Sequence, residues 1–525
     1  MSRRSLIAVL FVFAGVFGWA PGWLASLGPS PAAAQGPRIL RVATDTNLPW
    51  LDPHMGTAFT LRELSSHVFE GLVTIGEDFG VIPQLAESWS VSGDGTEYTF
   101  KLRPGVKFHN GRTVTAEDVK ASIDRFVQFG ARRGDLGAVQ AVTVVDPLTV
   151  RISLKQAQGS FLGALANPVA LLGIMPKELV QGAKDPLQPP QLVGTGPFRL
   201  AQWVRDQQIT LQRFDDYTRD RRIPASGLGG DRSALLDEVH IISTGESATR
   251  FAGLERGDFD YAMALAPTAF ERLRSSAALD AIVLKPFTQV ILQLNANRAP
   301  FNQVKARQAV SRGLDMESIM RGVTGNQPAF YRLQPSLFFP EQRVWHNTAG
   351  EDVYNRKNVD LARRLLKESG YDGRPIALVT NRDIEWLYRA AVPVQPQLEA
   401  IGFKVELVVR DWPGQIAQQK EGNFDMATNG ISTRPEPTGF DYLFRCGASY
   451  EAYGYCDPEM DKALAAGVRE REPERRAQAY AQAQKQFYET VPLVKIGDMF
   501  QLDGATKALK GYRVFFLRRF WNVSK

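Results

Sequence analysis

The chain has 525 residues, a length at which roughly three domains are expected. Hydrophobic residues make up 44% and charged residues 22%, close to the globular average, which excludes a disordered tail, a collagen-like fibre and a disulfide-rich scaffold. The 62 basic residues exceed the 56 acidic ones only slightly, and without a basic block this excess does not indicate a nucleic-acid partner.

The N-terminus has the pattern of a secretory signal peptide. Arg3 and Arg4 form a basic region, an uncharged apolar run follows at 6–20, and the alanines at 32–34 provide a cleavage site. We expect residues 1–34 to be removed and the mature protein to be periplasmic. The alternative is an uncleaved anchor, although the 15 residues of the run fall short of the roughly 20 needed to span a bilayer.

A strand, a helix and a hairpin are the first elements predicted in the mature chain. Apolar and polar side chains alternate over 97–102, as they do in a strand. Thr115 is a suitable N-cap for the helix that follows, because apolar residues then recur at helical spacing. The alternating segments 142–144 and 150–154 flank an Asp-Pro turn and predict the hairpin.

Helix and strand patterns alternate in the second half of the chain. A helix should begin near Asn358, bury Leu361 and Leu365, and end at Gly370. Another helix precedes a strand at 404–409. This alternation predicts α/β units, and the hairpin indicates that the sheets are mixed.

Two short segments resemble each other. Residues 256–262 and residues 421–427 each combine the end of a helix, a glycine turn and a strand entered through Phe-Asp. Two such copies would suit two domains built on similar α/β plans. A common way of entering a strand explains the likeness equally well.

The two cysteines become informative if the protein is exported. Cys446 and Cys456 lie ten apart in a Gly- and Tyr-rich stretch, so a loop disulfide is the simplest interpretation in an oxidising compartment. Closing so short a loop would stabilise the fold by about 2–3 kcal/mol. A metal-binding pair is the alternative, but the sequence has no histidine nearby to complete a zinc site.

Familiar catalytic motifs are absent from the sequence. It contains no nucleophile elbow, no zinc-protease motif and no P-loop, and its five histidines are scattered. We therefore expect a protein that is not an enzyme, without cofactor or metal. A secreted hydrolase stays open, because a carboxylate pair can come from distant strands.

Polar and aromatic residues follow several predicted strands and indicate a ligand site. Loops at strand ends are where α/β proteins hold ligands, and aromatic walls with a few charged groups suit a small molecule. The candidate ligand-binding residues are Thr46, Asn47, Arg382, Trp412, Asn429, Arg434, Glu436 and Phe440. For each of them, the alternative is that the side chain lies on the surface or packs within the fold and contacts no ligand.

Several segments together resemble one known family. Residues 85–89 (LAESW) and 93–126 are similar to the hallmark of the family 5 bacterial extracellular solute-binding proteins. The segments 194–198 (GTGPF) and 304–315 (VKARQAVSRGLD) resemble further parts of that family, as does the cysteine loop. The family includes dipeptide-, oligopeptide-, glutathione- and nickel-binding components of ABC importers.

The resemblance implies an α/β, two-lobed periplasmic-binding-protein fold of the large type II class. It would have mixed sheets, a two-strand hinge and an extra subdomain in the first lobe. The first lobe is expected at 35–287 plus 493–525, its inserted subdomain at 76–193, and the second lobe at 288–492. The ligand would bridge both lobes, and the closed form would dock on an ABC permease and ATPase complex. We expect a monomer that binds a small-molecule or peptide ligand and no nucleic acid.

The resemblance also suggests roles for individual residues. Arg382 is placed to meet a ligand carboxylate, and Glu436 to meet an ammonium. Trp412 would form a wall, with Asn47 and Asn429 as hydrogen-bond partners.

Departures from the family pattern limit the prediction of the solute. Ile431 stands where an aromatic residue is usual, and Arg434 adds a cation close to Glu436. A peptide or peptide-like solute is the first expectation, and an opine, an oligosaccharide or a metal chelate is the alternative. Nickel is less expected, because no histidine follows His346. A chaperone or signalling module of the same fold is a further alternative.

Overall fold

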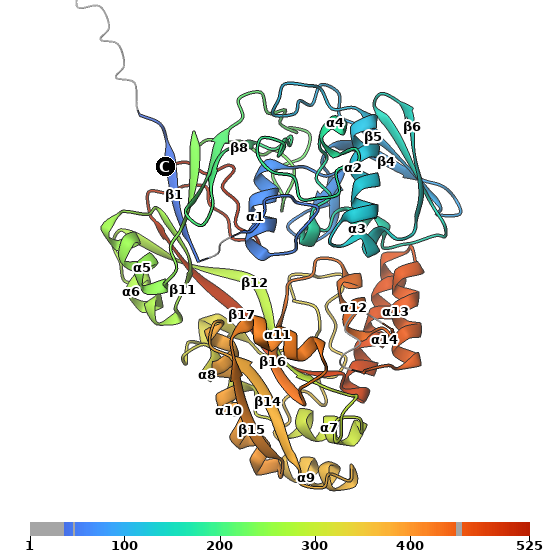
Figure 1. Cartoon of the computed structure of the whole chain (residues 1–525), viewed down its shortest axis with the longest axis vertical. Helices are drawn as coiled ribbons and strands as arrows, with labels where there is room; N and C mark the ends of the chain where they lie inside the picture. The colour runs from blue at the N-terminus through green and yellow to red at the C-terminus, as the bar shows by residue number, and fades with distance from the viewer. Residues whose placement is uncertain (1–35, 46–47, 448–453) are drawn as a thin grey trace, which may run out of the picture. The chain divides into compact units, whose positions relative to one another are not determined.

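The computed structural model describes residues 36–45, 48–447 and 454–525 (Figure 1). The predicted signal peptide, 1–34, and the candidate residues Thr46 and Asn47 lie outside the described residues. Beyond Pro37 the chain forms one compact unit, Arg38–Lys525, which contains all the elements described below.

Two long antiparallel strands run through the middle of this unit. β12 (Leu279–Leu294) and β17 (Leu493–Thr506) pair along most of their length. β11 (Tyr261–Leu265) pairs with the C-terminal half of β17, whereas β16 (Met426–Ser432) pairs with the C-terminal half of β12. The two long strands thus connect two lobes, and Figure 1 shows them passing from one to the other.

The first lobe extends the large sheet outward from β11 and adds smaller sheets. Its part of the large sheet has the order β11-β1-β10-β9-β8; an antiparallel sheet has the order β4-β5-β7-β6, and β2 pairs with β3. The strands are β1 (Ile39–Thr44), β2 (Val73–Ile75), β3 (Val81–Pro83), β4 (Ala86–Val91), β5 (Glu97–Leu102), β6 (Val139–Asp146), β7 (Thr149–Leu154), β8 (Phe198–Val204), β9 (Gln208–Arg213) and β10 (Glu238–Ser243). The helices are α1 (Phe59–Val68), α2 (Ala116–Phe129), α3 (Phe161–Leu165), α4 (Lys177–Val180), α5 (Ser247–Arg256) and α6 (Phe270–Arg274).

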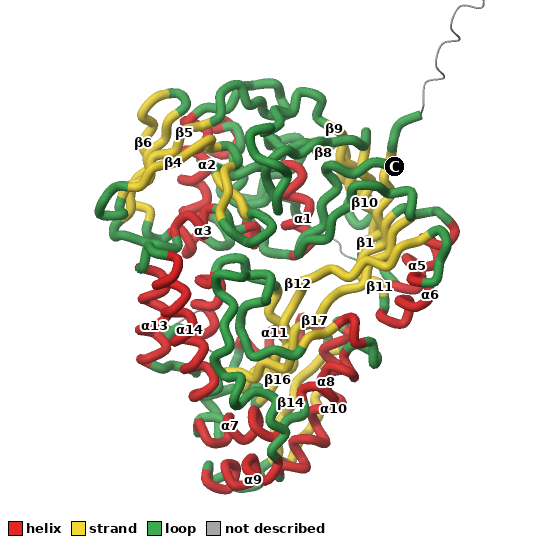
Figure 2. The backbone as a smooth tube through the Cα atoms, turned by 180° about the vertical axis from the view of Figure 1, so that it is seen from behind, coloured by secondary structure: helices red, strands yellow, loops and turns green. Residues whose placement is uncertain are grey.

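The second lobe extends the same sheet in the other direction, in the order β12-β16-β14-β15. Its further strands are β13 (Tyr331–Arg332), β14 (Pro375–Asn381) and β15 (Lys404–Arg410). Its helices are α7 (Val304–Gly313), α8 (Met316–Val323), α9 (Val359–Glu368), α10 (Glu385–Ile401), α11 (Trp412–Lys420), α12 (Asp441–Phe444), α13 (Pro458–Arg469) and α14 (Pro473–Thr490). Figure 2 shows α8 and α10 beside β14 and β16, with α13 and α14 side by side at the edge of this lobe.

Each lobe has its own apolar core. One cluster of buried apolar side chains combines β1, α1 and α2 with the C-terminal residues 515–523, and another combines β12, α7, α8 and α10. Separate cores are what two lobes require. The prediction of an α/β fold with mixed sheets, two lobes and a two-strand connection is confirmed, whereas the boundaries 35–287 plus 493–525, 76–193 and 288–492 stay predictions.

Local sequence signals account for two of the helices. Thr115 and Asp118 form a capping box at the start of α2, and the Asn358 side chain accepts a hydrogen bond of 2.9 Å from the Leu361 backbone at the start of α9. The prediction for the buried face of α9 was wrong by one position. Ala362 and Leu366 are buried, whereas the two predicted leucines are half-buried, because the helix meets α7 along the neighbouring face.

The two similar segments occupy matching places in the two lobes. α5, Gly257 and β11 form the first copy, and α11, Gly422 and β16 form the second; both glycines have positive φ. In each copy the aspartate before the strand is buried and ion-paired, Asp260 with Arg41 at 3.0 Å and Asp425 with Arg374 at 2.9 Å. The likeness therefore reflects a shared local plan.

The predicted disulfide is confirmed. Cys446 and Cys456 are joined by a bond of 2.06 Å just before α13. Within the described residues, no helix combines the length and the apolar character that crossing a membrane requires.

Candidate functional site

A cavity of about 730 Å³, here called the hinge cavity, lies where the lobes meet β12 and β17. The first lobe contributes Asp45 after β1 and Glu246 before α5. The second lobe contributes residues 382–386 and 389, from the loop after β14 and the start of α10. Phe287 of β12 and residues 499–502 of β17 complete the wall. A volume of this size suits a small-molecule ligand, whose usual sites measure roughly 300–1,000 Å³.

Arg382 presents a positive charge to the hinge cavity. Its guanidinium lies 4.5 Å from the centre of the Tyr388 ring, and its Nη2 donates a hydrogen bond of 3.1 Å to the tyrosine hydroxyl. The side chain is exposed, and it forms no ion pair with a carboxylate of the described residues. A cation held by an aromatic ring is oriented without being neutralised, so it can receive a ligand carboxylate.

Trp386 supplies an aromatic wall beside this cation. The indole packs against β16 at Gly430, where an added β-carbon would lie 2.6 Å from its Cη2 atom. A larger residue at Gly430 would therefore displace the ring. The predicted wall residue, Trp412, lies next to this region: its backbone N–H donates to Asp383 Oδ2 at 2.7 Å, but its side chain does not line the hinge cavity.

Arg250 holds together the first-lobe wall of the hinge cavity. It is buried, and its guanidinium donates to the backbone carbonyls of Thr244, Met263 and Ala264 at 2.7–2.8 Å. Burial lowers the pKa of Arg250, and the carboxylates of Asp45, Asp503 and Glu246 oppose that effect. The arginine thus fixes the backbone between β10 and α5 to the end of β11.

Asn429 points to the opposite face of the sheet from Trp386. Its Nδ2 donates to Gln293 Oε1 at 3.2 Å, and Gln419 of α11 donates to the same oxygen at 2.6 Å. Neighbouring residues of a strand alternate between faces, so Asn429 lies under α11 while Gly430 faces the indole. The structure does not bring Asn429 to the hinge cavity, and its predicted contact with a ligand stays a prediction.

Glu436 is engaged within the protein. Its carboxylate is buried and forms an ion pair with Arg476, which also donates from Nε to the Gly467 carbonyl at 2.9 Å. Burial raises the pKa of Glu436, and the guanidinium opposes that rise. Gly163 of α3 abuts the same carboxylate from the first lobe. Arg476 already neutralises the Glu436 carboxylate. The predicted role of Glu436 in binding an ammonium stays a prediction.

Phe440 and Arg434 brace the segment around Glu436. The Phe440 ring is buried, with its centre 5.4 Å from that of Phe338, and belongs to a third apolar cluster with α13 and α14. Arg434 is half-buried; its carbonyl accepts a hydrogen bond of 2.6 Å from Gln342, and its side chain covers Gly439. Their predicted contacts with a ligand stay predictions.

The lobes also touch directly, along a seam that runs from α3 to α13 (Figure 1). Arg471 Nη1 donates to the Gly93 carbonyl at 2.7 Å, and the Ser160 backbone N–H donates to the Val468 carbonyl at 3.3 Å. Nearer the crossing strands, the Phe59 ring meets Phe287 edge-on at 5.3 Å. The lobes are therefore in contact at this seam as well as through the crossing strands.

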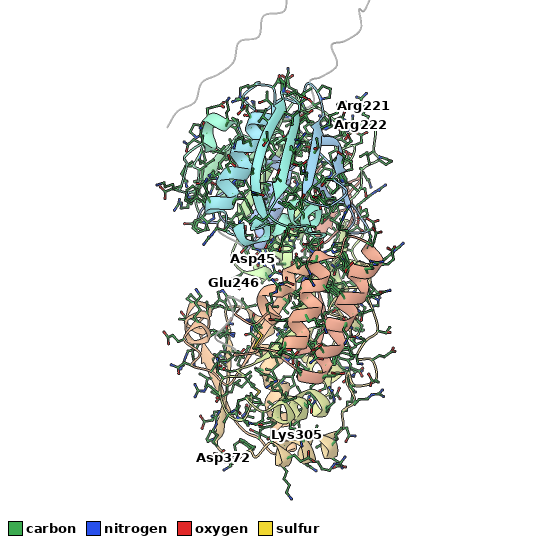
Figure 3. The ribbon with its side chains drawn as sticks, turned by 90° about the vertical axis from the view of Figure 1, so that its right-hand side faces the viewer. Asp45, Arg221, Arg222, Glu246, Lys305 and Asp372 are labelled. Carbon is green, nitrogen blue, oxygen red and sulfur yellow. A yellow bond between two sulfur atoms is a disulfide. The ribbon has the colours of Figure 1, made fainter. Side chains whose placement is uncertain are left out.

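The sequence analysis missed the three charged residues that the first lobe contributes to the hinge cavity among the described residues. Asp45 and Glu246 supply the acidic groups of the first-lobe wall, and Figure 3 shows both at the level where the lobes meet. Asp45 follows the strand that precedes the candidates Thr46 and Asn47, so the strand-end argument could have found it. Arg250 gave no signal, because only the folded chain brings the carbonyls before α5 and those of β11 to its guanidinium.

Two lobes joined by two strands, with a cavity between them, define a binding protein that closes over a solute. Residues 80–451 match the family described as bacterial extracellular solute-binding proteins, family 5 Middle, and the chain belongs to that family.

Curated relatives match along nearly the whole chain. The glutathione-binding protein GsiB of Salmonella typhimurium is 27% identical over 512 residues, covering 93% of this chain and 95% of the relative. The probable peptide ABC transporter periplasmic-binding protein y4tO of Sinorhizobium fredii is 28% identical over 552 aligned positions, covering 100% of this chain and 99% of the relative.

Solved structures are also similar. AgaA of A. tumefaciens R10, in complex with agropinic acid, has a TM-score of 0.75 and 25% identity, covering 90% of this chain and 94% of its own. DppA of Helicobacter pylori, in complex with the peptide STSA, has a TM-score of 0.77 and 22% identity, covering 93% of this chain and 98% of its own. The second likeness supports the two-lobed fold alone.

Proposed function

We propose that this chain is the periplasmic solute-binding component of an ABC importer, which captures a peptide or peptide-like solute between its lobes and delivers it to a membrane permease. The observation that carries the proposal is the hinge cavity, because both lobes and both crossing strands line it. The names of the relatives supply the class of solute and the transport role. We further propose that residues 1–34 direct export and are removed, and that the mature protein acts as a monomer without enzymatic activity.

The charges of the hinge cavity fit a zwitterionic solute. Arg382 lies on the second-lobe wall, and Asp45 and Glu246 lie on the first-lobe wall. Arg389, on the same wall as Arg382, is already paired with Glu385. A solute that carries a carboxylate and an ammonium would satisfy both walls at once.

Capture follows from this arrangement as a shift of populations. A solute that touches only one wall gains little from closure, whereas one that contacts both walls binds the closed form more tightly and shifts the equilibrium towards it. Phe287 and Trp386 would exclude water from the apolar part of the solute. The permease would then bind the closed form.

Calorimetry tests the proposal. Ligand-free protein, prepared by unfolding and refolding, would be titrated with a library of di- to tetrapeptides, and with opines and oligosaccharides as competitors. We expect saturable peptide binding that Arg382→Met weakens by at least about tenfold. Tight binding of another solute class without any peptide binding contradicts the peptide assignment, and conversion of the bound solute to product contradicts the non-enzymatic one.

An opine is the second candidate solute. The observation that favours it is the likeness to AgaA, whose structure holds agropinic acid. An opine also carries carboxylates, so Arg382 would serve either class, and the competition experiment distinguishes them.

A further inference from the structure

Gly430 of β16 and Trp386 of α10 fit together at the second-lobe wall of the hinge cavity. Among the described residues, Trp386 lines this cavity and Gly430 does not. A β-carbon added to the glycine would lie 2.6 Å from Cη2 of the indole and 3.3 Å from Cζ2. Non-bonded carbon atoms prefer a separation of about 3.5–4.0 Å, so the ring occupies the space that any other residue at position 430 would need.

The backbone at Gly430 cannot easily move away from the ring. β16 pairs with β12 from Met426 to Ser432, and Gly430 stands opposite Val290. On that side, Thr288 Oγ1 would lie 3.1 Å from the added β-carbon. The φ angle of Gly430 is not in the left-handed region, so an alanine could adopt the same backbone conformation. The close approach of the indole, and not the backbone, therefore requires a glycine here.

The loop that carries the indole is also fixed. Asp383 Oδ2 accepts a hydrogen bond of 2.7 Å from the Trp412 backbone N–H. The Ile384 N–H donates to Asn381 Oδ1 at 2.8 Å. The indole packs against the apolar core of the second lobe, and it also lines the hinge cavity. A ring displaced from β16 would therefore turn into the hinge cavity, which is the open space beside it.

Trp386 and Arg382 belong to the same wall of the hinge cavity. Arg382 can receive a ligand carboxylate, because the Tyr388 ring and hydroxyl orient its guanidinium without neutralising it. A peptide whose C-terminal carboxylate is held in this way would place its last residue beside the indole. The room for the side chain of that residue then depends on how close the ring lies to β16.

We propose that Gly430 is a specificity-determining residue of the hinge cavity, which lets the Trp386 indole lie against β16 and so leaves room for a large apolar side chain on the last residue of a peptide. A β-carbon at position 430 would move the ring by about 1 Å before a normal carbon–carbon separation is reached. One methylene in an apolar pocket changes selectivity by about 10- to 200-fold, so a shift of this size is enough to change the preferred side chain. The proposal rests on the proposed function and deepens it, because it names the class of peptide that the cavity prefers.

Calorimetry with three tripeptides tests the proposal. Ala-Ala-Ala, Ala-Ala-Leu and Ala-Ala-Phe would each be titrated into ligand-free wild type and Gly430→Ala. We expect the wild type to bind Ala-Ala-Phe at least as tightly as Ala-Ala-Ala. Gly430→Ala should weaken the binding of Ala-Ala-Phe by at least about tenfold and that of Ala-Ala-Ala by less than about threefold, because only the large side chain needs the space that the ring would enter.

Variants of Trp386 make the test specific to the indole. Trp386→Leu should lower the affinity for Ala-Ala-Phe relative to that for Ala-Ala-Ala, since the large side chain loses the ring that it packs against. Adding Gly430→Ala to Trp386→Leu should change this ratio of affinities by less than about twofold, because the smaller leucine leaves space for the β-carbon. Thermal unfolding checks that each variant folds. If Gly430→Ala alone is too unstable to titrate, the double variant should recover the fold, and Trp386→Leu still reports on the wall.

The outcomes separate this proposal from the proposed function. An equal loss for all three peptides in Gly430→Ala, an unchanged ratio in Trp386→Leu, or a further fall of the ratio in the double variant would overturn this proposal alone. So would a wild type that binds other peptides but none of these three, or that favours Ala-Ala-Ala over Ala-Ala-Phe. If the wild type binds no peptide at all, the peptide assignment in the proposed function fails, and this proposal fails with it.

Discussion

Gly163 of α3 and the carboxylate of Glu436 lie in direct contact across the seam between the lobes, so closely that a β-carbon on the glycine would overlap the carboxylate. The glycine belongs to the first lobe, and the carboxylate is fixed in the second by Arg476. A side chain at position 163 would therefore keep the lobes apart.

Gly163→Ala should accordingly weaken solute binding in the hinge cavity, although Gly163 does not line that cavity. We expect a loss of affinity of about tenfold, corresponding to about 1–2 kcal/mol of closure energy. Calorimetry with the best ligand and small-angle scattering with and without it would measure the effect. The matched control is Gly93→Ala on the same seam, where an added β-carbon has nothing within 4 Å. Equal affinity in Gly163→Ala and Gly93→Ala would contradict the seam's role in closure.

Arg382→Met should reduce the affinity for a peptide but have little effect on the same peptide with an amidated C-terminus. The guanidinium is held by Tyr388 and pairs with no described carboxylate, so its contribution depends on the ligand's negative charge. We expect a loss of about 1–3 kcal/mol for the free acid. Titration of both peptides into wild type and variant gives a double-mutant cycle. A coupling energy near zero would remove Arg382 from the carboxylate site.

Glu436→Gln should destabilise the fold strongly, because it leaves the buried Arg476 without its counter-charge. Breaking a buried pair by removing one partner costs about 3–5 kcal/mol. The double variant Glu436→Gln/Arg476→Met should recover part of this loss, since no buried charge remains unpaired. Urea unfolding of the wild type, Glu436→Gln, Arg476→Met and the double variant measures these free energies of unfolding. If the single and double variants are equally stable, the pair contributes no coupling.

Asp441 should make the protein less stable as the pH rises towards neutrality. Its pKa in the folded protein, about 7, lies above the ordinary value of 3.8, so the folded state favours the protonated form. The stabilisation is complete below the ordinary value and is lost as the pH rises through about 7, up to about 4 kcal/mol in all. The unfolding free energies of wild type and Asp441→Asn should differ least below about pH 4 and should diverge as the pH rises through about 7, with the wild type becoming the less stable. Parallel curves would show that this carboxyl titrates normally.

The sequence predicted the fold better than the site. Strand 97–102 and the cap at Thr115 came from local alternation and capping, which tertiary packing left unchanged. The buried face of α9 was missed by one position, since the choice between Leu361 and Ala362 depends on the neighbouring helix α7. Patterns within one element do not contain that information.

Site residues were harder to predict because their roles depend on partners far away in the chain. Glu436 reads as an available carboxylate until Arg476, forty residues later, is seen to pair with it. Arg382 could be placed in a ligand cavity because it follows a strand end. Gly430 has no such signal, since only the folded chain brings the Trp386 indole against it.

The pairing of β12 with β17 is irregular at two places, and the wider irregularity lies between Leu284 and Thr288. Leu284 faces Gln501 and Thr288 faces Met499, so three residues of β12 stand opposite a single residue of β17. At the second irregularity, between Val290 and Ile291, a single residue of β17 is skipped and pairing resumes at once. Backbone hydrogen bonds along the rest of the crossing resist twisting of one strand against the other. The lobes should therefore rotate relative to one another about this short unpaired stretch between Leu284 and Thr288. Along the two strands, amide hydrogen exchange should be fastest there. The length of this unpaired stretch, more than the contacts between the cavity walls and the solute, would then determine how widely the lobes open to receive the next ligand.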